Sequence, residues 1–424
     1  MENGLILTWM MNTMNKKCLL ILGGGLDQVP GIIKAKDMEL YTIVLDGNSD
    51  AVGKEYADEF YTVSIKHIKQ IEEFIHNQLN RKVDGVIAFG VDIPLIIAKT
   101  ADLLNINYTI PFESAKLSED KFDSKEFMKL NNIPIPEYKI VSNIQDINLF
   151  IKNYGLPIVI KPVDNSAARG ISYIDKQEDL EKYYNYALGF SKQKKVQVEQ
   201  YLSGRQISSE TLVINGNIHN IAFLDRHYND MKKFLPNIIE NGGDMPSIFM
   251  KEKHKKQLAK YFKIITNKLN IKNGIIKGDI VIHNDNLYII EFALRLSGGN
   301  FSTVCIPEST GIDFIKIAIQ LHLNINISNN DLILEQKNNY ISMRYKFVED
   351  LQCVRKLRIK EIKLPHKQAD IILSNFHAKA GEDISCKTTD HAKRLGFAVA
   401  RGENRKNAIT TAQSFLDNVD IIFE

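Results

Sequence analysis

The first hundred residues alternate between short apolar runs and stretches with helical spacing of apolar positions. Continuous apolar runs rich in β-branched residues predict buried strands at 18–22, 41–45 and 83–89. Helical periodicity predicts helices at 28–38, 68–79 and 93–104. Strands that alternate with helices in this way predict a doubly wound α/β domain with a parallel sheet.

Beyond residue 113 the pattern changes to a mixture of helices and antiparallel strands. A helix is predicted at 119–131, and the two prolines of the segment 133–136 end it. Shorter elements follow in the order helix 143–153, strand 158–162, loop 163–170, strand 171–174, helix 178–191 and strand 196–200. Longer antiparallel strands are expected within 207–226 and 275–294, with a helix at 252–269 between them. A β-rich tail is expected after residue 330, with a final helix at 405–418. The predicted fold class is therefore α/β combined with α+β.

Composition limits the classes of protein that fit this pattern. A single core stops growing near about 250–300 residues, so 424 residues predict two or three domains. The formal net charge of +3 gives no reason to expect nucleic acid or an anionic membrane as a partner. No apolar run approaches the ~18 residues of a membrane span, and residues 1–14 read as a loose tail. The four cysteines form no CxxC pair, which favours a reducing cytoplasm over disulfides or a zinc site.

The most informative segment is the predicted hairpin around Asn284-Asp285-Asn286. With Asp285 as its centre, Asp279 faces Glu291 across the ladder, where like charges ~4.5–5.5 Å apart repel. A divalent cation removes this conflict, and Mg²⁺ (or Mn²⁺) suits oxygen ligands. Alternation assigns Asp279, Glu291 and Arg295 to one face of the hairpin. It assigns to the other face the apolar residues Ile280, Ile282, Tyr288, Ile290, Phe292 and Leu294.

The alternative for this hairpin is a solvated face with a salt bridge, but the residues that follow favour a ligand site. Arg295 leads directly into Ser297, Gly298 and Gly299. A glycine loop offers backbone N–H groups, and an arginine beside it completes a cradle for an anion.

A second candidate site combines lysines with a loop of small residues. Lys161 ends an apolar strand, and the loop after it contains Ser166, Ala167, Ala168 and Gly170. A lysine at a strand end suits a phosphate, and small side chains let loop amides approach triphosphate oxygens. Each lysine alone would be an ordinary surface residue, and no Walker motif occurs.

Two further segments allow more than one interpretation. The strand 196–200 runs into a linker with Gly204, whose exposed backbone could pair with a flat heterocycle or simply form a turn. The run Gly23-Gly24-Gly25 lacks the third glycine of a dinucleotide fingerprint. It fits either close approach to a ligand or a tight turn between strand and helix.

Taken together, these segments resemble the ATP-grasp superfamily, and within it the carboxylate–amine (L-amino-acid) ligase group. The resemblance covers most of the chain and rests on IVIKPVDNSAARGIS, VEQYLSGRQIS and GDIVIHNDNLYIIEFALRLSGG. It implies four parts: a tail at 1–14, a Rossmann-like pre-ATP-grasp domain at 15–112, an ATP-grasp domain at 113–330 and a C-terminal α/β region at 331–424. Within the ATP-grasp domain, a mobile lid is expected at about 136–200.

The resemblance also implies residue roles. Lys121, Lys161 and the loop residues Ser166, Ala167, Ala168 and Gly170 would contact ATP phosphates. Glu199 would bind the adenine amino group, with Gln200, Tyr201 and Leu202 presenting backbone. Gln206 occupies the position of the ribose-binding acid, and Ala293 that of a frequent metal-binding Asn, so both depart from the family pattern. Asp279 and Glu291 would bind Mg²⁺, Arg295 would act in catalysis, and Ser297, Gly298 and Gly299 would hold substrate.

The implied activity is an ATP-dependent ligase that couples a carboxylate to an amine through an acyl phosphate. Small-molecule substrates and ATP with Mg²⁺ are expected, and the resemblance allows a homodimer. Two alternatives stay open: a carboxylase that activates bicarbonate, and a non-catalytic nucleotide-binding protein.

Overall fold

The computed structural model describes residues 16–106, 110–333, 339–351, 357–366, 368–385 and 387–424. The predicted tail at 1–14 and the cysteines at 353 and 386 lie outside the described residues. Cys18 and Cys305 are buried free thiols. None of the described helices is long and apolar enough to cross a membrane.

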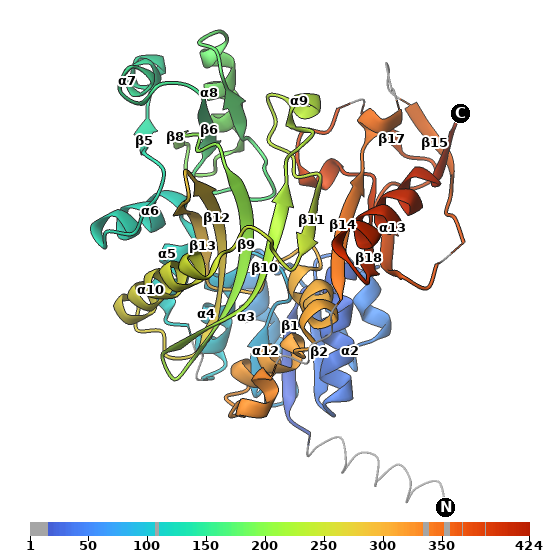
Figure 1. The fold of residues 1–424 in the computed structure, drawn as a ribbon. Helices are drawn as coiled ribbons and strands as arrows, with labels where there is room; N and C mark the ends of the chain where they lie inside the picture. The colour runs from blue at the N-terminus through green and yellow to red at the C-terminus, as the bar shows by residue number, and fades with distance from the viewer. Residues whose placement is uncertain (1–15, 107–109, 334–338, 352–356, 367, 386) are drawn as a thin grey trace, which may run out of the picture.

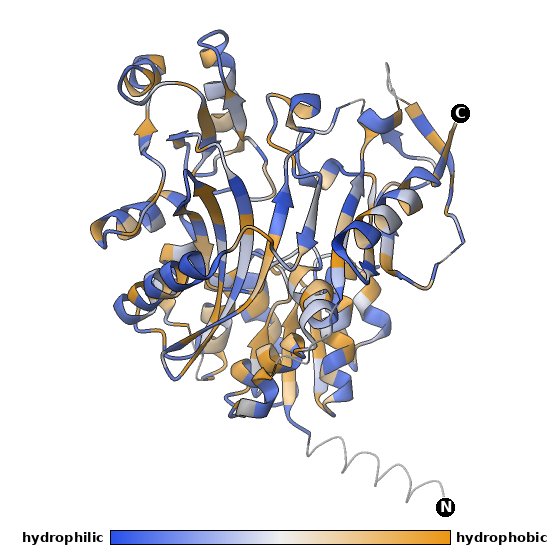
Figure 2. Ribbon diagram, in the orientation of Figure 1, coloured by the Kyte–Doolittle hydropathy of each residue, from blue (hydrophilic) through white to orange (hydrophobic). Residues whose placement is uncertain are grey.

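The predicted parallel α/β fold of the N-terminal segment is confirmed. Its four strands are parallel, in the order β3-β2-β1-β4, with bounds β1 (Cys18–Leu22), β2 (Tyr41–Asp46), β3 (Glu59–Thr62) and β4 (Gly85–Ile87). The associated helices are α2 (Val29–Asp37), α3 (Ile68–Asn77) and α4 (Pro94–Leu103). The edge strand β3 was not predicted, because it is only half-buried and lacks a continuous apolar run. Figure 2 shows hydrophobic residues concentrated in the strands of this domain.

The predicted helix at 119–131 matches α6 (Lys121–Leu130), and a further helix that was not predicted, α5 (Phe112–Glu119), directly precedes it. Asp120 separates them, because its side chain accepts hydrogen bonds from the backbone N–H groups of Phe122 and Asp123. The cap places Lys121 at the first position of α6.

A small antiparallel lobe follows and lies at the upper left of Figure 1. Its strand order is β5-β8-β6-β7, with bounds β5 (Tyr138–Val141), β6 (Ile158–Pro162), β7 (Ser172–Ile174) and β8 (Val196–Gln200). Helices α7 (Ile144–Tyr154) and α8 (Leu180–Phe190) contribute to its own apolar cluster. The lobe occupies the residues for which a mobile lid is predicted, and its mobility stays a prediction.

The central sheet has eight strands in the order β13-β12-β9-β10-β11-β14-β18-β16. Five come from the middle of the chain: β9 (Arg205–Ile214), β10 (Asn217–His227), β11 (Gly242–Met245), β12 (Gly274–His283) and β13 (Asn286–Ala293). Helix α10 (Glu252–Lys268) packs against β10 and β13. The helices after β13 include α11 (Ile306–Thr310) and α12 (Phe314–His322).

The C-terminal region continues this sheet rather than only packing on it. It supplies β14 (Tyr340–Lys346), β16 (Ile371–Phe376) and β18 (Gly396–Gly402). A separate sheet holds β15 (Leu357–Lys363), β17 (Asp383–Ile384) and β19 (Asp420–Phe423), and α13 (Arg405–Asp417) matches the predicted final helix.

The β12–β13 hairpin confirms the predicted pairing of Asp279 with Glu291, but the predicted faces need correction. The turn has two residues, because His283 pairs with Asn286, and a bulge then shifts the register after Asp279. The bulge moves Ile290 to the side of Glu291, where it lines a cavity, while Ile289 packs in the core. Tyr288 is half-buried and lies outside that apolar cluster.

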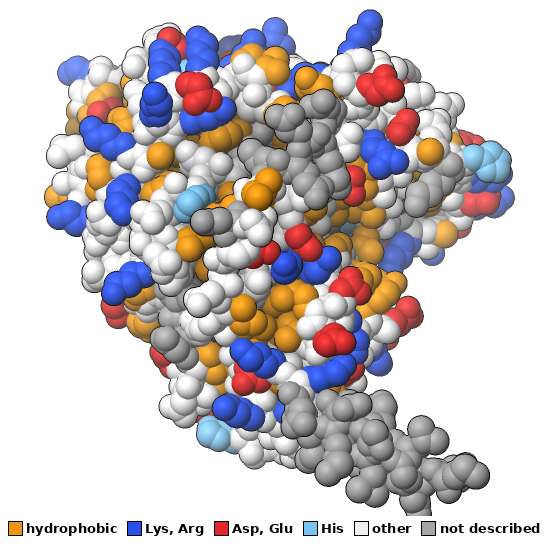
Figure 3. Space-filling model, turned by 60° about the horizontal axis from the view of Figure 1, so that its bottom comes forward, with side chains coloured by type: hydrophobic (Ala, Val, Ile, Leu, Met, Phe, Trp, Pro, Cys, Tyr) orange, Lys and Arg blue, Asp and Glu red, His pale blue; other side chains and the backbone are white. Residues whose placement is uncertain are grey.

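Charged side chains of both signs are interspersed among hydrophobic ones over the described part of the face in Figure 3. No continuous surface of one sign covers that part of the face, in agreement with the small net charge.

Candidate active site

Two adjoining cavities bring the predicted site residues together. The first, of about 260 Å³, is lined by all but one of the predicted nucleotide contacts, namely Lys121, Lys161, Ser166, Ala167, Ala168, Glu199, Gln200, Tyr201, Leu202 and Gln206. The second, of about 490 Å³, is lined by Ser297, Gly298 and Gly299. Their common wall is formed by Asp92, Ser166, Ala167, Arg226, Lys277, Asp279, Arg295 and His391.

Gly170 is the predicted contact that lines neither cavity. Its φ is +74°, and a Cβ there would meet Phe190 at 2.7 Å. Gly170 therefore shapes the end of the loop, because an L side chain would be strained in this conformation.

The facing carboxylates of Asp279 and Glu291 are held by cations. Lys277 Nζ donates to Asp279 Oδ2 at 2.6 Å, and Arg226 lies 3.3 Å from Asp279 Oδ1. Lys121 Nζ donates to Glu291 Oε2 at 2.9 Å. Burial opposes ionisation, but the surrounding cations outweigh it, so the pKa values of Asp279 and Glu291 lie below their ordinary values. Both acids are therefore available as charged oxygen ligands at neutral pH.

This donor set suits Mg²⁺, which is usually bound by one or two carboxylates together with phosphate oxygens and water. In the described part of the chain, no group of three or more His, Cys, Asp or Glu side chains forms a metal cage. Ala293 is buried and adds no oxygen ligand. The Asp279–Glu291 pair thus fits a metal ion that shares its coordination with a phosphate ligand.

A second ionic cluster lies at the wall of the first cavity, around Glu199. This residue is 3% exposed, and its Oε1 is 2.5 Å from Lys161 Nζ and 3.1 Å from Lys125 Nζ. Burial opposes ionisation of Glu199, but the two lysines lower its pKa. Glu199 thereby fixes Lys161 at the cavity wall. Lys125 was not singled out in the sequence, although its position four residues after Lys121 on α6 places both lysines on one helix face.

Some backbone N–H groups at the end of β8 and just after it already form hydrogen bonds within the protein, which limits the donors available to a ligand. The N–H groups of Gln200 and Tyr201 donate to the carbonyl oxygens of Glu137 and Pro157 at 2.8 and 3.1 Å. The Leu202 N–H is consequently the candidate donor toward a heterocycle. The apolar walls that would cover such a ring are Val159, Ile171, Ile238, Val281 and Ile290.

Arg295 is fixed at the common wall by a residue from the N-terminal domain. Its Nε donates to Asp92 Oδ1 at 2.6 Å and its Nη1 to the Leu296 carbonyl at 2.9 Å. Burial is the largest single influence and raises the pKa of Asp92, but Arg295 together with Lys121 and Lys277 outweighs it and lowers the pKa to about 2. The guanidinium is thus paired with Asp92 rather than with Glu291, and its remaining N–H groups can serve a ligand in either cavity.

The loop at Ser297, Gly298 and Gly299 lies directly against the chain that follows β4. A Cβ on Gly298 would lie 2.8 Å from the Gly90 carbonyl oxygen, so this approach requires glycine. Gly299 has a φ of +62°. The contact connects the N-terminal domain to the loop predicted to hold substrate.

Glu210 on β9 anchors the same loop from behind. Its Oε1 accepts hydrogen bonds from the Ser297 N–H at 3.1 Å and from Ser302 Oγ at 2.9 Å, and its Oε2 accepts one from Ser297 Oγ. Burial raises the pKa of Glu210 to about 7 despite these bonds. Glu210 was missed in the sequence because its partners lie about ninety residues further along the chain.

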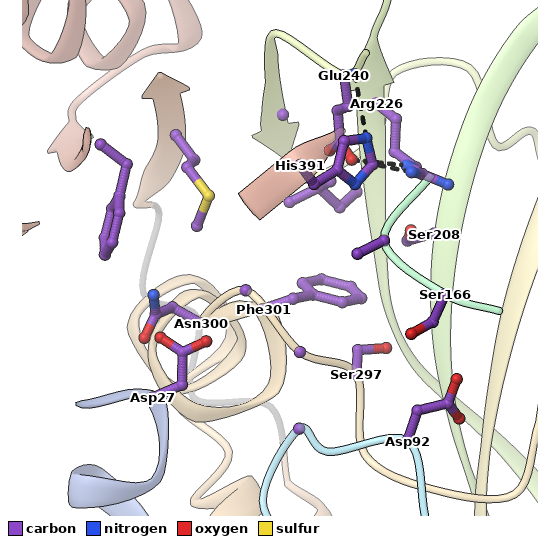
Figure 4. A pocket seen from close by; sticks show the side chains of 18 of the residues that line it. Asp27, Asp92, Ser166, Ser208, Arg226, Glu240, Ser297, Asn300, Phe301 and His391 are labelled. Atoms are coloured by element: carbon purple, nitrogen blue, oxygen red, sulfur yellow. Dashed lines mark hydrogen bonds and ion pairs between the residues drawn. The ribbon is translucent and has the colours of Figure 1, made fainter. Parts of the chain in front are cut away.

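Other residues of the second cavity come from distant segments without a local motif. Arg226 Nη2 is 2.9 Å from Glu240 Oε2, and the Glu240 N–H donates to His391 Nε2 at 3.4 Å. Figure 4 shows these three residues together on one side of the cavity, with Asp27 and Asn300 on another side. The glycine run at 23–25 leads from β1 into a 3-10 helix at Leu26–Gln28, and Asp27 of that helix lines the cavity.

Residues 119–299 match the family model described as the ATP-grasp (A) domain of phosphoribosylglycinamide synthetase. Among curated proteins, the carbamoyl phosphate synthase large chain of Clostridium acetobutylicum is 23% identical over 308 residues, which cover 69% of this chain and 27% of that protein. The large chain of Archaeoglobus fulgidus is 24% identical over 328 residues, covering 72% of this chain and 29% of that protein. The chain therefore spans less than a third of the length of these relatives.

Solved structures share the fold over nearly the whole chain. The L-amino acid ligase from Bacillus licheniformis has a TM-score of 0.78 at 18% identity, covering 96% of this chain and 99% of that one. The phosphoribosylglycinamide synthetase from Anaerococcus prevotii has a TM-score of 0.72 at 19% identity, covering 97% and 100%. The biotin carboxylase domain of the Hydrogenobacter thermophilus 2-oxoglutarate carboxylase has a TM-score of 0.73 at 17% identity, covering 96% and 91%. At these identities the likeness establishes the fold.

Proposed function

We propose that this chain, which belongs to the ATP-grasp superfamily, uses ATP to activate a carboxylate as an acyl phosphate and couples it to an amine, releasing ADP and phosphate. The observation that carries the proposal is the common wall of the two cavities. Asp279, Arg295 and Ser166 line both of them. A triphosphate in the first cavity and a carboxylate in the second would therefore meet at this wall.

The first cavity supplies the groups that would hold the nucleotide. Its apolar walls suit the adenine ring, Gln206 suits a ribose hydroxyl, and Lys161 with Lys121 offers charge to the phosphates. Mg²⁺ held by Asp279 and Glu291 would neutralise phosphate charge during transfer. Lys121 would then be released from Glu291 to serve a phosphate oxygen.

At the wall, Arg295 and the amides of the loop 297–299 would orient the carboxylate and stabilise negative charge. A carboxylate oxygen forms a bond to the γ-phosphorus while the bond to the ADP oxygen breaks. The amine nitrogen then bonds to the acyl carbon, phosphate leaves, and the amine loses a proton to solvent. This sequence needs no nucleophilic side chain, so the buried Cys305 has no role in it.

Both substrates are proposed to be small molecules, and a cytoplasmic location and a homodimer remain predictions. The biotin carboxylase domain from Hydrogenobacter thermophilus is described as a dimer in complex with MgADP and bicarbonate. That complex motivates a test with bicarbonate alongside organic acids.

The test is a matrix of carboxylates and amines, including bicarbonate, scored by ADP and phosphate release. Glu291→Ala is expected to retain the fold, because Glu291 lines a cavity, and to abolish phosphate release. Leu130→Ala, an exposed position, is the matched control with normal activity. Activity with bicarbonate alone would replace the ligase proposal with a carboxylase, and normal ADP release by Glu291→Ala would overturn the metal assignment. No ADP release with any mixture would favour a nucleotide-binding protein without catalysis.

A further inference from the structure

The second cavity contains one carboxylate that forms no ion pair with a lysine or arginine of the described residues. Four acidic side chains line it, and three of them are paired: Asp92 with Arg295, Glu240 with Arg226, and Asp279 with Lys277. The fourth is Asp27, and the described residues include no lysine or arginine in an ion pair with it.

Asp27 has two polar neighbours, and neither neutralises it. The Asn300 side chain lies beside the Asp27 carboxyl group in Figure 4, and Asn300 and His377 both act to lower the pKa of Asp27. Burial lowers the pKa of His377, so its imidazole is largely neutral at pH 7. Burial also raises the pKa of Asp27 above its ordinary value, which reflects the cost of a charge without a cationic partner. A ligand with a positive charge would remove this cost.

The position of Asp27 separates it from the reacting groups. In Figure 4, Asp27 and Asn300 lie at one end of the cavity, Ser166 and Asp92 lie at the other end, and the Phe301 ring lies between them. Apolar and aromatic side chains that line the same cavity include Leu224, Phe301, Met343, Tyr345 and Phe397.

We propose that Asp27 and Asn300 form a subsite for a protonated amino group of the carboxylate substrate, separated from the reacting carboxyl group by an apolar segment that lies on Phe301. This inference rests on the proposed function, because it takes the carboxylate to lie at Arg295. It adds a substrate class: amino acids whose amino group is remote from the carboxyl group. An α-amino acid has its two charged groups adjacent, so it would not place one on Asp27 and the other at Arg295.

The experiment compares acids that differ by one amino group. Pentanoate and hexanoate are compared with 5-aminopentanoate and 6-aminohexanoate, and with the 2-amino isomers. Hydroxylamine traps the acyl phosphate: its nitrogen bonds to the acyl carbon, phosphate leaves, and a hydroxamic acid forms. The rates of hydroxamate and ADP formation are measured for the wild type, Asp27→Asn and the control Asp37→Asn, an exposed position at the end of α2.

A charge-assisted hydrogen bond corresponds to a preference of about 10- to 100-fold for the acid with the remote amine. Asp27→Asn should reduce that preference to near one while its affinity for ADP stays at the wild-type value, and Asp37→Asn should keep the preference. An unchanged preference in Asp27→Asn overturns the subsite. Equal activity of the wild type on acids with and without the amine, or a preference for the 2-amino isomers, also overturns it and leaves the proposed function intact. Absence of ADP and hydroxamate with every acid would instead refute the proposed function itself.

Discussion

Replacing Glu210 with glutamine should make the stability of this protein less sensitive to pH. Glu210 is fully buried, and burial raises its pKa from 4.5 to about 7. A group whose pKa is raised by folding contributes stability that is present below the unfolded value and lost as the pH rises through the folded value. In the wild type this loss occurs between about pH 4.5 and pH 7, while glutamine has nothing to titrate.

The size of the effect follows from the two pKa values. At 1.36 kcal/mol per pKa unit, the difference between 4.5 and about 7 corresponds to about 3 kcal/mol. In Glu210→Gln, the new side chain would accept the two bonds from the Ser297 N–H and Ser302 at its carbonyl oxygen, and its amide would donate to Ser297 Oγ. We therefore expect the variant to gain about 3 kcal/mol relative to the wild type between pH 4.5 and pH 8.

Urea denaturation followed by circular dichroism at both pH values measures this change, with the exposed Glu72→Gln as the control. Because other titrating groups are common to both proteins, they cancel in the comparison. A difference between wild type and Glu210→Gln that is the same at both pH values would refute the reasoning.

Two further predictions concern the common wall and the loop before β7. Arg295→Lys should lower turnover by about 10²-fold or more with nearly unchanged ADP affinity. The reason is that lysine lacks the forked guanidinium group that can contact Asp92 and a ligand together. Near-normal turnover in a stable variant would remove the catalytic role. Backbone hydrogen exchange in residues 164–170 should slow when a non-hydrolysable ATP analogue is added. Ala167 and Ala168 of this loop have positive φ values and line the first cavity. Unchanged exchange would count against a closing lid.

The hairpin shows how far local patterns determine the site. A turn centred on Asp285 predicts the pairing of Asp279 with Glu291, and the structure has this pairing. Two deviations from that geometry cancel: the turn is centred half a residue earlier, and the extra residue at the bulge restores the register. The predicted face of Ile290 was wrong for the same reason, since a bulge reverses alternation beyond it.

The site residues that were predicted belong to short segments with their own chemistry, such as Lys161 before the small-residue loop. Those that were missed depend on long-range contacts. Asp92 and its partner Arg295 are separated by 203 residues. Lys277 lies among the other site residues only because β12 pairs with β9 and β13. A single sequence contains no local signal for such pairs.

The two cavities differ in the same respect: short local segments form most of the first, whereas the second depends on contacts between distant segments. The first is built mainly from the segment 121–206 and from one hairpin, where lysines, small residues and acids occur in recognisable order. The second also includes Asp27 from the N-terminal domain, and Met343, His377 and Arg394 from the C-terminal region. Because the C-terminal strands join the central sheet, they carry side chains into the place where the substrate would bind. The residues of the proposed nucleotide site therefore follow from local motifs, whereas those of the second cavity depend on tertiary structure, which is why the sequence alone did not predict the proposed subsite at Asp27.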